Sequence, residues 1–399
     1  MAKIKKIKGR QVFDSRGNPT VEAEIFSDSG NSALAIVPSG ASTGTHEAFE
    51  LRDKDNKKYL GKSVIKAIEN INGPIAKALK NFKVTEQRKI DQTLIDLDGS
   101  DQKKNLGANA ILAVSIASCK LASLERKVSL FKNIGESKSF ELPVPLLNII
   151  NGGVHAKNNL DIQEFMIRPE NTDTFSEAIR RSFLVIQNLK TFLENTNVGD
   201  EGGFAPNLKG NEEAIDLIIK AIKKSGFKPG DDISICLDVA ANELNKPKTT
   251  EYYSDLFKKY PIKSIEDPFK EDDWESWKKL TKSENVQVVG DDLFATNINR
   301  LKKGVGEKSA NAILVKLNQI GTVSETLDVI DFAHKNGFNT IISHRSGDSE
   351  DTFIADLAVA TNSSQIKAGS LARSERVSKY NRLLRIEEEL GTSAKRAKI

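Results

Sequence analysis

The sequence lacks the features that define several common protein classes. It has only two cysteines among 399 residues, Cys119 and Cys236, and both lie in apolar runs without a partner at metal-ligand spacing. We therefore expect buried thiols rather than a disulfide or a redox pair. The amino terminus has no continuous apolar stretch of about 7–15 residues, as a signal peptide would, and no later run approaches the roughly 18 residues of a membrane span. These absences predict a cytoplasmic protein without a membrane partner.

The chain also lacks an excess of charge of either sign. Lysine and arginine number 59 against 55 aspartates and glutamates, which leaves a formal net charge of +4. A nearly balanced, mixed surface gives no case for a nucleic-acid binder.

The length allows two domains of unequal size, because domains mostly run to about 100–250 residues. Near residues 4–13, 20–28 and 32–40 the pattern predicts three strands separated by turn residues. From about Lys62 to Arg126 the periodicity becomes helical, and residues 107–127 carry small side chains around much of the helix. A strand meander followed by helices predicts an N-terminal α+β cap domain, residues 1–135.

From residue 141 to 399, short apolar strand patterns alternate with amphipathic helices, one of which has a capping box at Thr322 and Glu325. Polar residues end six successive strands at intervals of 28, 25, 25, 28 and 23: Asp238, Glu266, Asp291, Lys316, His344 and Lys367. Each interval fits one strand–helix unit, so we predict an α/β barrel of the TIM type with these residues at one mouth. A doubly wound open sheet is the alternative, but the Gly-rich dinucleotide loop expected early in such a repeat is absent.

Three of these strand ends are carboxylates: Asp238, Glu266 and Asp291. Any one of them could simply cap the following helix or turn. Three hard oxygen ligands without nearby cysteine or histidine at zinc spacing favour Mg²⁺ instead.

Two of the other strand ends are lysines. A lysine is usually solvated, but one that ends an apolar strand beside a metal has its pKa lowered by positive charge and desolvation. Lys316 or Lys367 could then abstract a proton from a carbon next to a carboxylate, and metal ions with a second lysine would stabilise the enolate.

Loop segments add further candidates. Glu201 lies in the Gly-rich segment VGDEGGFAP between two predicted helices, which would let a mobile acid approach a ligand. Gln163 and Glu164 are predicted at the end of another strand. Arg345 and Ser346 form a natural phosphate clasp, because the guanidinium offers a planar fork of donors. The loop PSGASTG, residues 38–44, is rich in hydroxyls but is weak evidence alone.

Together these segments resemble the enolase family. The similarity is carried by GASTG (40–44), INGGVHAKNNLDIQEFM (150–166), VGDEGGFAP (198–206), LDVA (237–240), SIEDP (264–268), GDDLFATN (290–297), KLNQIGT (316–322), SHRSGDSEDTFIADLAVA (343–360) and SERVSKYNRLLRIEEELG (374–391), in that family's order. The resemblance implies a small α+β cap, then a barrel whose first strands are not all parallel. It also implies glycolytic, reversible dehydration of 2-phosphoglycerate to phosphoenolpyruvate in a homodimer or higher assembly.

The resemblance further implies a role for each candidate. One Mg²⁺ would be bound by Asp238, Glu266 and Asp291, and a second would be bound by Ser42. Lys316 would be the base and Glu201 the acid, with Glu164 assisting. The substrate would contact Lys367 through its carboxylate and Arg345 and Ser346 through its phosphate, in a pocket also lined by His155, Gln163 and His344.

Three departures and two alternatives accompany this interpretation. The chain is shorter than the family pattern before VGDEGG and between DVAANEL and YYSDLF, where surface loops can be trimmed at little cost. Lys157 stands where the family has a small or acidic residue.

A related enzyme acting on a phosphonate analogue is one alternative, and a non-catalytic binding protein with an inherited barrel is the other. The retained pocket residues argue against the first, and the complete set of metal ligands and base argues against the second.

Overall fold

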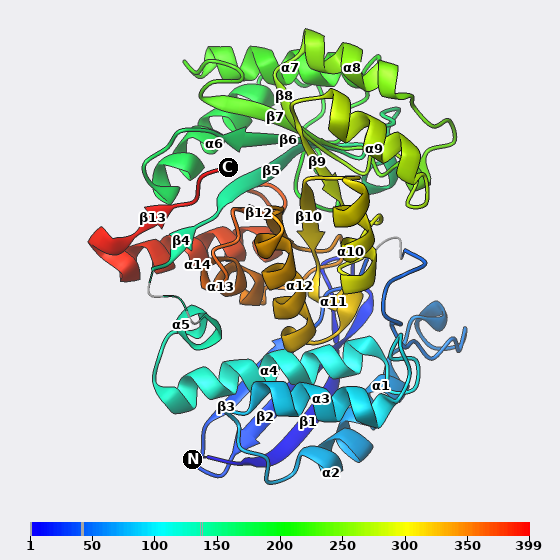
Figure 1. The fold of residues 1–399 in the computed structure, drawn as a ribbon, viewed down its shortest axis with the longest axis vertical. Coiled ribbons are helices and arrows are strands. Elements are labelled where there is room, and N and C mark those ends of the chain that lie inside the picture. The colour runs from blue at the N-terminus through cyan, green and yellow to red at the C-terminus, as the bar shows by residue number, and fades with distance from the viewer. Residues whose placement is uncertain (1, 41–43, 136, 138) are drawn as a thin grey trace.

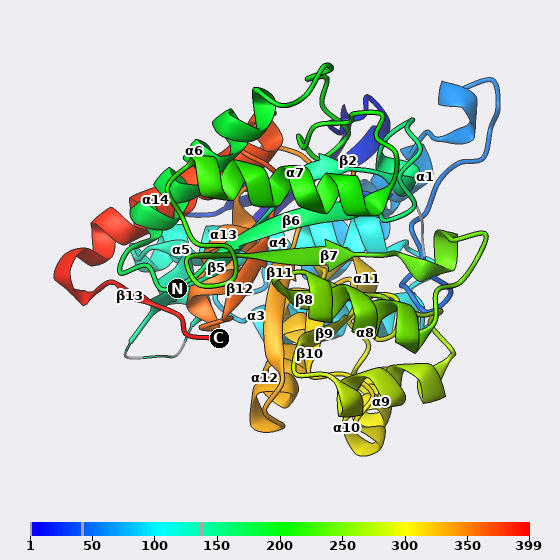
Figure 2. The same ribbon diagram turned by 90° about the horizontal axis from the view of Figure 1, so that it is seen from above.

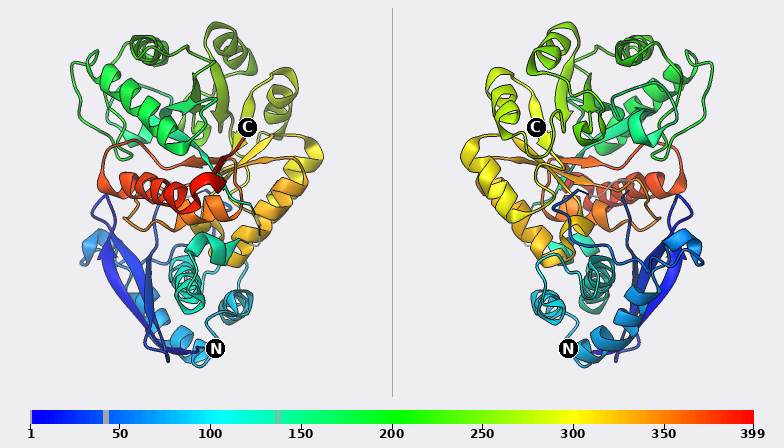
Figure 3. Two further views of the ribbon diagram at one scale, coloured as in Figure 1. Left: turned by 90° about the vertical axis from the view of Figure 1, so that its left-hand side faces the viewer. Right: turned by 90° about the vertical axis from the view of Figure 1, so that its right-hand side faces the viewer.

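The chain begins with an antiparallel three-stranded sheet, as the turn residues predicted. A computed structural model describes residues 2–40, 44–135, 137 and 139–399. The sheet consists of β1 (Ile4–Phe13), β2 (Pro19–Ser27) and β3 (Ser32–Ile36), in that order. Helices lie on one face of this sheet, some against its strands and others against a neighbouring helix, and with the sheet they make the cap at the lower end of the molecule (Figures 1 and 3). These helices are α1 (Ile65–Asn70), α2 (Ala76–Leu79), α3 (Gln87–Asp98), α4 (Ala108–Arg126) and α5 (Leu130–Ile134).

Helix α4 is the centre of the cap. Its alanines and serines let it pack closely against β2, β3 and α3, and nearly all of it is buried. Within the described residues it is the one helix long and apolar enough to cross a membrane by composition alone. Of its most apolar window 83% is buried in the fold, which is typical of a core helix.

Eight strands then close into a barrel, which confirms the predicted fold and excludes the open sheet. In sequence they are β5 (Val144–Asn151), β6 (Glu164–Pro169), β7 (Ile233–Asp238), β8 (Ile262–Glu266), β9 (Gln287–Gly290), β10 (Ala312–Val315), β11 (Asn339–Ser343) and β12 (Gln365–Lys367). Strand β6 runs antiparallel to both β5 and β7, and the other pairs are parallel. The barrel is thus regular except for one reversed strand.

Helices surround the barrel (Figure 2). They are α6 (Phe175–Lys190), α7 (Asn211–Lys224), α8 (Thr250–Lys259), α9 (Trp274–Ser283), α10 (Ile298–Glu307), α11 (Leu317–Ile320), α12 (Val323–Lys335), α13 (Phe353–Ala360) and α14 (Ser374–Leu390). Two short strands, β4 (Glu141–Leu142) and β13 (Lys395–Arg396), pair in parallel beside it. Apolar side chains from several strands, among them Met166, Cys236 and Leu314, fill the barrel interior. Both cysteines are buried and unpaired, as expected.

The cap forms hydrogen bonds to the barrel domain at the first turn of α12. The N-cap half of the predicted capping box is present, since the backbone N–H of Glu325 donates to Thr322 Oγ1 at 3.1 Å, while the Glu325 side chain accepts from the Thr322 hydroxyl at 2.6 Å. Asp91 of α3 accepts from the backbone N–H and the hydroxyl of Ser324 at 2.9 and 2.6 Å, and from the hydroxyl of Ser115 in α4 at 2.6 Å. Because α12 follows strand β10 closely, this contact also anchors the segment that carries Lys316.

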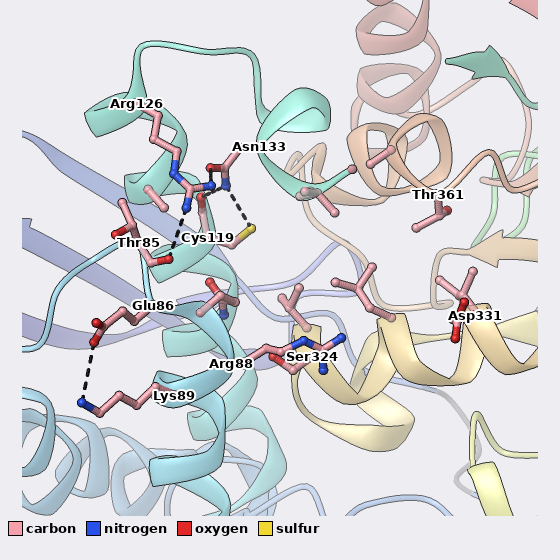
Figure 4. Close-up of a pocket in the computed structure, with 18 of the residues that line it drawn as sticks. Thr85, Glu86, Arg88, Lys89, Cys119, Arg126, Asn133, Ser324, Asp331 and Thr361 are labelled. Atoms are coloured by element: carbon pink, nitrogen blue, oxygen red, sulfur yellow. Dashed lines mark hydrogen bonds and ion pairs between the residues drawn. The ribbon is translucent and has the colours of Figure 1, made fainter. Parts of the chain in front are cut away.

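A cavity of about 830 Å³ lies between the cap helices and α12 and α13 (Figure 4). Its polar groups serve contacts between elements. Arg126 donates to the side chain of Asn133 at 2.9 Å and to the carbonyl of Thr85 at 3.3 Å, and Asn133 contacts Cys119. None of the residues predicted to act on a substrate lines this cavity.

Candidate active site at the mouth of the barrel

The six predicted strand-end residues do converge. Asp238, Glu266 and Lys367 are the last residues of β7, β8 and β12, whereas Asp291, Lys316 and His344 directly follow β9, β10 and β11. Five of them line one pocket, and Glu266 reaches the same cluster through Lys367. Parallel strands deliver their carboxyl ends to one face, so residues far apart in sequence meet there.

The placement of Gln163 and Glu164 corrects one prediction. They precede and begin strand β6 instead of ending a strand. Because β6 is reversed relative to its neighbours, its first residue lies at the same mouth, where Glu164 pairs in register with Asp238. Both residues line the pocket, as does His155 from the loop after β5.

Lys367 is the central cation of the site. Its Nζ lies 2.9 Å from Asp238 Oδ2, 2.9 Å from Glu266 Oε2 and 3.1 Å from Glu164 Oε1, and its side chain is buried. Burial lowers the pKa of this ammonium, but the three carboxylates raise it well above the usual value. Lys367 therefore remains charged and cannot serve as a base in this arrangement.

Lys316 differs from the expectation of a lowered pKa. Its ammonium contacts Asp291 Oδ2, and Gln319 Nε2 donates to the other oxygen of Asp291 at 2.9 Å. Burial lowers the pKa of Lys316, but the Asp291 carboxylate more than offsets this effect, so the pKa is raised. The lysine can accept a proton only where another cation competes for that carboxylate.

Two carboxylates and two imidazoles form a second cluster in the pocket. One ligand atom each of His155, Glu164 and Glu201 lies within 4.8 Å of the others. Burial, followed by the charge of Glu201, raises the pKa of Glu164 well above its usual range. Burial would also raise the pKa of Glu201, but the histidines beside it hold it well below that range. The pKa values of this acid pair are therefore shifted in opposite directions, which makes Glu164 the stronger proton acceptor of the two.

Glu201 is anchored, contrary to the expectation of a mobile acid. Its carboxylate accepts from Asn148 Nδ2 at 3.0 Å, and its carbonyl accepts from the backbone N–H of Ser370 at 2.9 Å. Gly202 has a φ of +82°, and a Cβ there would lie 2.5 Å from the carbonyl oxygen of Ala372. Glycine is thus required at position 202 because of its positive φ and because no Cβ fits there. This close approach keeps the loop against the barrel.

Arg345 and Ser346 line the pocket, but Arg345 has a partner that sequence reasoning missed. Glu47, from the loop after β3 in the cap, accepts from Nη1 and Nη2 of Arg345 at 2.9 and 3.3 Å. Both side chains are at least nine-tenths buried. The acidic residue three positions after GASTG (40–44) was the only available signal, and nothing in the sequence tied it to Arg345.

The carboxylates fit a divalent cation chemically. Asp238, Glu266 and Asp291 are buried oxygen donors on neighbouring strands, and burial and the charge of Asp238 raise the pKa of Glu266 well above normal. Such a repulsive cluster gains from added positive charge. Two acids that sequence reasoning passed over adjoin it: Asp292 lines the pocket, while Asp267 accepts the backbone N–H groups of Asp291 and Asp292.

The predicted ligand Ser42 lies outside the described residues. The flanks of its loop do reach the site. Gly40 lines the pocket, and its carbonyl accepts from Arg16 at 2.8 Å, while the backbone N–H of Gly44 donates to Glu47 at 3.1 Å.

Several polar atoms face this site without a hydrogen-bond partner among the described residues. They are His155 Nδ1, Glu164 Oε2 and His344 Nε2, all buried. Buried polar groups are normally satisfied, so unpartnered atoms clustered in one pocket indicate that it binds a polar ligand.

Comparisons with known proteins agree with this geometry. The family model "Enolase, N-terminal domain" matches residues 4–134, and "Enolase, C-terminal TIM barrel domain" matches residues 139–252 and 242–398. The chain is also 60% identical to the protein named Enolase from Pelagibacter ubique (strain HTCC1062), over 418 aligned positions that cover all of both chains. The alignment is longer than this chain of 399 residues, so the relative carries residues that this chain lacks.

Proposed function

Because the chain belongs to the enolase family and is a hydro-lyase that interconverts 2-phosphoglycerate with phosphoenolpyruvate and water, we propose that the pocket at the barrel mouth is its active site. One observation carries this proposal: two lysines and a carboxylic acid pair line a single buried pocket, with Lys367 in contact with Glu164 of the pair. The two groups correspond to the two proton transfers of the reaction.

In the direction of dehydration, Lys316 as the neutral amine removes the proton from the second carbon of 2-phosphoglycerate. The electron pair of that bond moves into the substrate carboxylate as an enolate. Lys367, which stays charged, binds the carboxylate and stabilises the added negative charge. The second carbon then forms a double bond to the third, and the bond from the third carbon to its hydroxyl breaks.

The departing hydroxyl takes a proton from the acid pair and leaves as water. Glu201 faces the hydroxyl, and Glu164 assists by holding the proton that the pair delivers. Arg345 and Ser346 bind the phosphate, while His155, Gln163 and His344 complete the pocket and orient the substrate.

Enolases require a divalent metal, and we propose Mg²⁺ held by Asp238, Glu266 and Asp291, with Ser42 toward a second ion. When bound, the metal would supply positive charge to the enolate oxygens and compete with Lys316 for the Asp291 carboxylate. Chelation should abolish activity and added Mg²⁺ should restore it, whereas full activity after exhaustive metal removal would overturn the ligand assignment. Asp291→Asn should raise the Mg²⁺ concentration that thermal stabilisation requires, a readout independent of turnover.

The direct test of function is the appearance of phosphoenolpyruvate absorbance from 2-phosphoglycerate, with substrate loss as a second readout. No turnover by the Mg²⁺-supplemented, folded chain would refute the proposed function.

We further propose that residues 1–135 and 141–399 are separate domains and that the protein acts in the cytoplasm as a homodimer or higher assembly, on the family resemblance. Light scattering coupled to size-exclusion chromatography tests the assembly, and a monomeric mass at micromolar concentration would contradict it.

A further inference from the structure

Arg376 is a fully buried cation that none of the proposed roles uses. It lies in the first turn of α14, with 0% of its surface exposed. Its guanidinium donates to three backbone carbonyls beside the active site: those of Arg345 at 2.6 Å, Ser346 at 2.6 Å and Asp200 at 3.1 Å. One side chain thus joins the segment after β11, which carries the phosphate clasp, to the loop that carries the acid Glu201.

The fourth contact of Arg376 determines the chemistry of a histidine. Its Nη1 contacts Nδ1 of His344. A guanidinium can only donate, so Nδ1 must be the accepting nitrogen, and in a neutral imidazole the proton then resides on Nε2. This Nε2 lies 3.4 Å from Glu201 Oε1.

The hydrogen bond at Nδ1 of His344 runs in the opposite direction to the one in a serine-protease triad. There a carboxylate accepts from Nδ1–H, which leaves the far nitrogen of the imidazole as a base. Here a donor occupies the same position, so the far nitrogen of His344 carries the hydrogen and faces Glu201 Oε1 without completing a hydrogen bond in this geometry. Burial lowers the pKa of His344 to about 4, with Glu201 opposing and Arg376 adding to this effect, so the imidazole is neutral near pH 7.

Packing leaves the guanidinium little freedom. A Cβ on Gly369 would lie 2.8 Å from Arg376 Cδ and 2.6 Å from the carbonyl oxygen of Glu201, so only glycine lets these two segments approach. The side chain of Arg376 is held on one side by this glycine and on the other by the carbonyls that it binds.

We propose that Arg376 is a positioning residue for the dehydration step: it holds His344 as the Nε2–H tautomer and ties the loop of Glu201 to the phosphate clasp. This inference rests on the proposed function, because it assigns the effect to the acid side of the reaction. Lys316, whose ammonium is paired with Asp291, should be unaffected.

The first test reads the tautomer in the wild-type holoenzyme. Nitrogen-15 labelling of the four histidines and long-range proton–nitrogen correlation spectra distinguish the two ring nitrogens, and His344→Gln assigns the signal. We expect a protonated Nε2 and an unprotonated Nδ1. A proton on Nδ1 of His344 in the wild-type protein would overturn the proposal without any variant at Arg376.

The second test is kinetic and uses Arg376→Met and Arg376→Lys with Arg382→Met as the matched control. Arg382 lies on the same helix and donates to the buried Asp356 at 2.8 Å, away from the pocket. We expect turnover to fall about 10–100-fold in both Arg376 variants, as is typical for a group that orients another. Exchange of the second-carbon hydrogen with deuterated solvent should continue, because Lys316 is intact.

The outcomes separate this inference from the proposed function. Equal turnover in Arg376→Met and Arg382→Met would overturn the positioning role, as would loss of hydrogen exchange in parallel with turnover. If Arg376→Met does not fold, the tautomer measurement and Arg376→Lys decide the question. An inactive wild-type protein that shows the Nε2–H tautomer would refute the proposed function but leave the role of Arg376 in setting the tautomer.

Discussion

The assignment of Lys316 as the base leads to a sharp prediction for Lys316→Gln. Glutamine cannot accept a proton at neutral pH, but its amide can still donate toward Asp291, which also keeps its 2.9 Å contact with Gln319. The substitution therefore removes the base with less structural damage than truncation to alanine, which would leave a buried carboxylate without its cation. Removing one partner of a buried ion pair costs about 3–5 kcal/mol, and the amide should recover part of this.

A positioned base typically contributes about 10²–10⁴-fold to the rate. At about 1.36 kcal/mol per factor of ten, this corresponds to a barrier increase of roughly 3–5 kcal/mol. The matched control is Lys103→Gln, because Lys103 is also buried and lies 3.0 Å from an acid, Glu325, outside the pocket. The control should lose stability to a similar or greater extent but keep its turnover number.

The assay compares turnover with exchange of the second-carbon hydrogen of 2-phosphoglycerate in deuterated solvent. Lys316→Gln should lose both. Glu201→Gln should lose turnover but keep exchange, because its base is intact and the enolate still forms. Exchange at the wild-type rate in Lys316→Gln would refute the assignment.

Three further substitutions test contacts that the tertiary structure creates. Glu47→Gln should lower kcat/KM about tenfold, because the neutral amide holds the phosphate-binding guanidinium of Arg345 less firmly and charge-assisted hydrogen bonds contribute about 1.5–3 kcal/mol. A raised kcat/KM would mean instead that Glu47 competes with the phosphate for Arg345. Asp91→Ala should lower stability by about 2–4 kcal/mol in thermal melting, because it leaves buried donors of the cap–barrel contact unpaired, whereas Asp96→Ala on the exposed side of the same helix should change it little. Gly202→Ala should impair turnover and stability more than Gly226→Ala. Both glycines have a φ of +82°, but only the Cβ added at residue 202 would meet a backbone atom. Equal losses of stability in the two variants would mean that the backbone conformation alone causes the loss.

The sequence was sufficient to predict the barrel and most of the pocket, because both depend on local pattern. Strand-end positions such as Asp238 and Lys367 recur at the length of one strand–helix unit, and parallel strands bring such ends together whatever the details of packing. The same reasoning failed for Glu164, because the direction of β6 depends on pairing with β5 and β7, which short apolar runs do not reveal.

The tertiary structure alone decided how the charges are paired. Glu47 meets Arg345, and Arg376 meets His344, across separations of 298 and 32 residues. The same is true of the raised pKa of Lys316, which follows from the Asp291 carboxylate at its side and reverses the expectation drawn from desolvation and a metal. Residue types and spacing determine which groups reach the mouth of the barrel. Their protonation and partners depend on distances of a few ångströms between distant segments, and only the folded chain sets these distances.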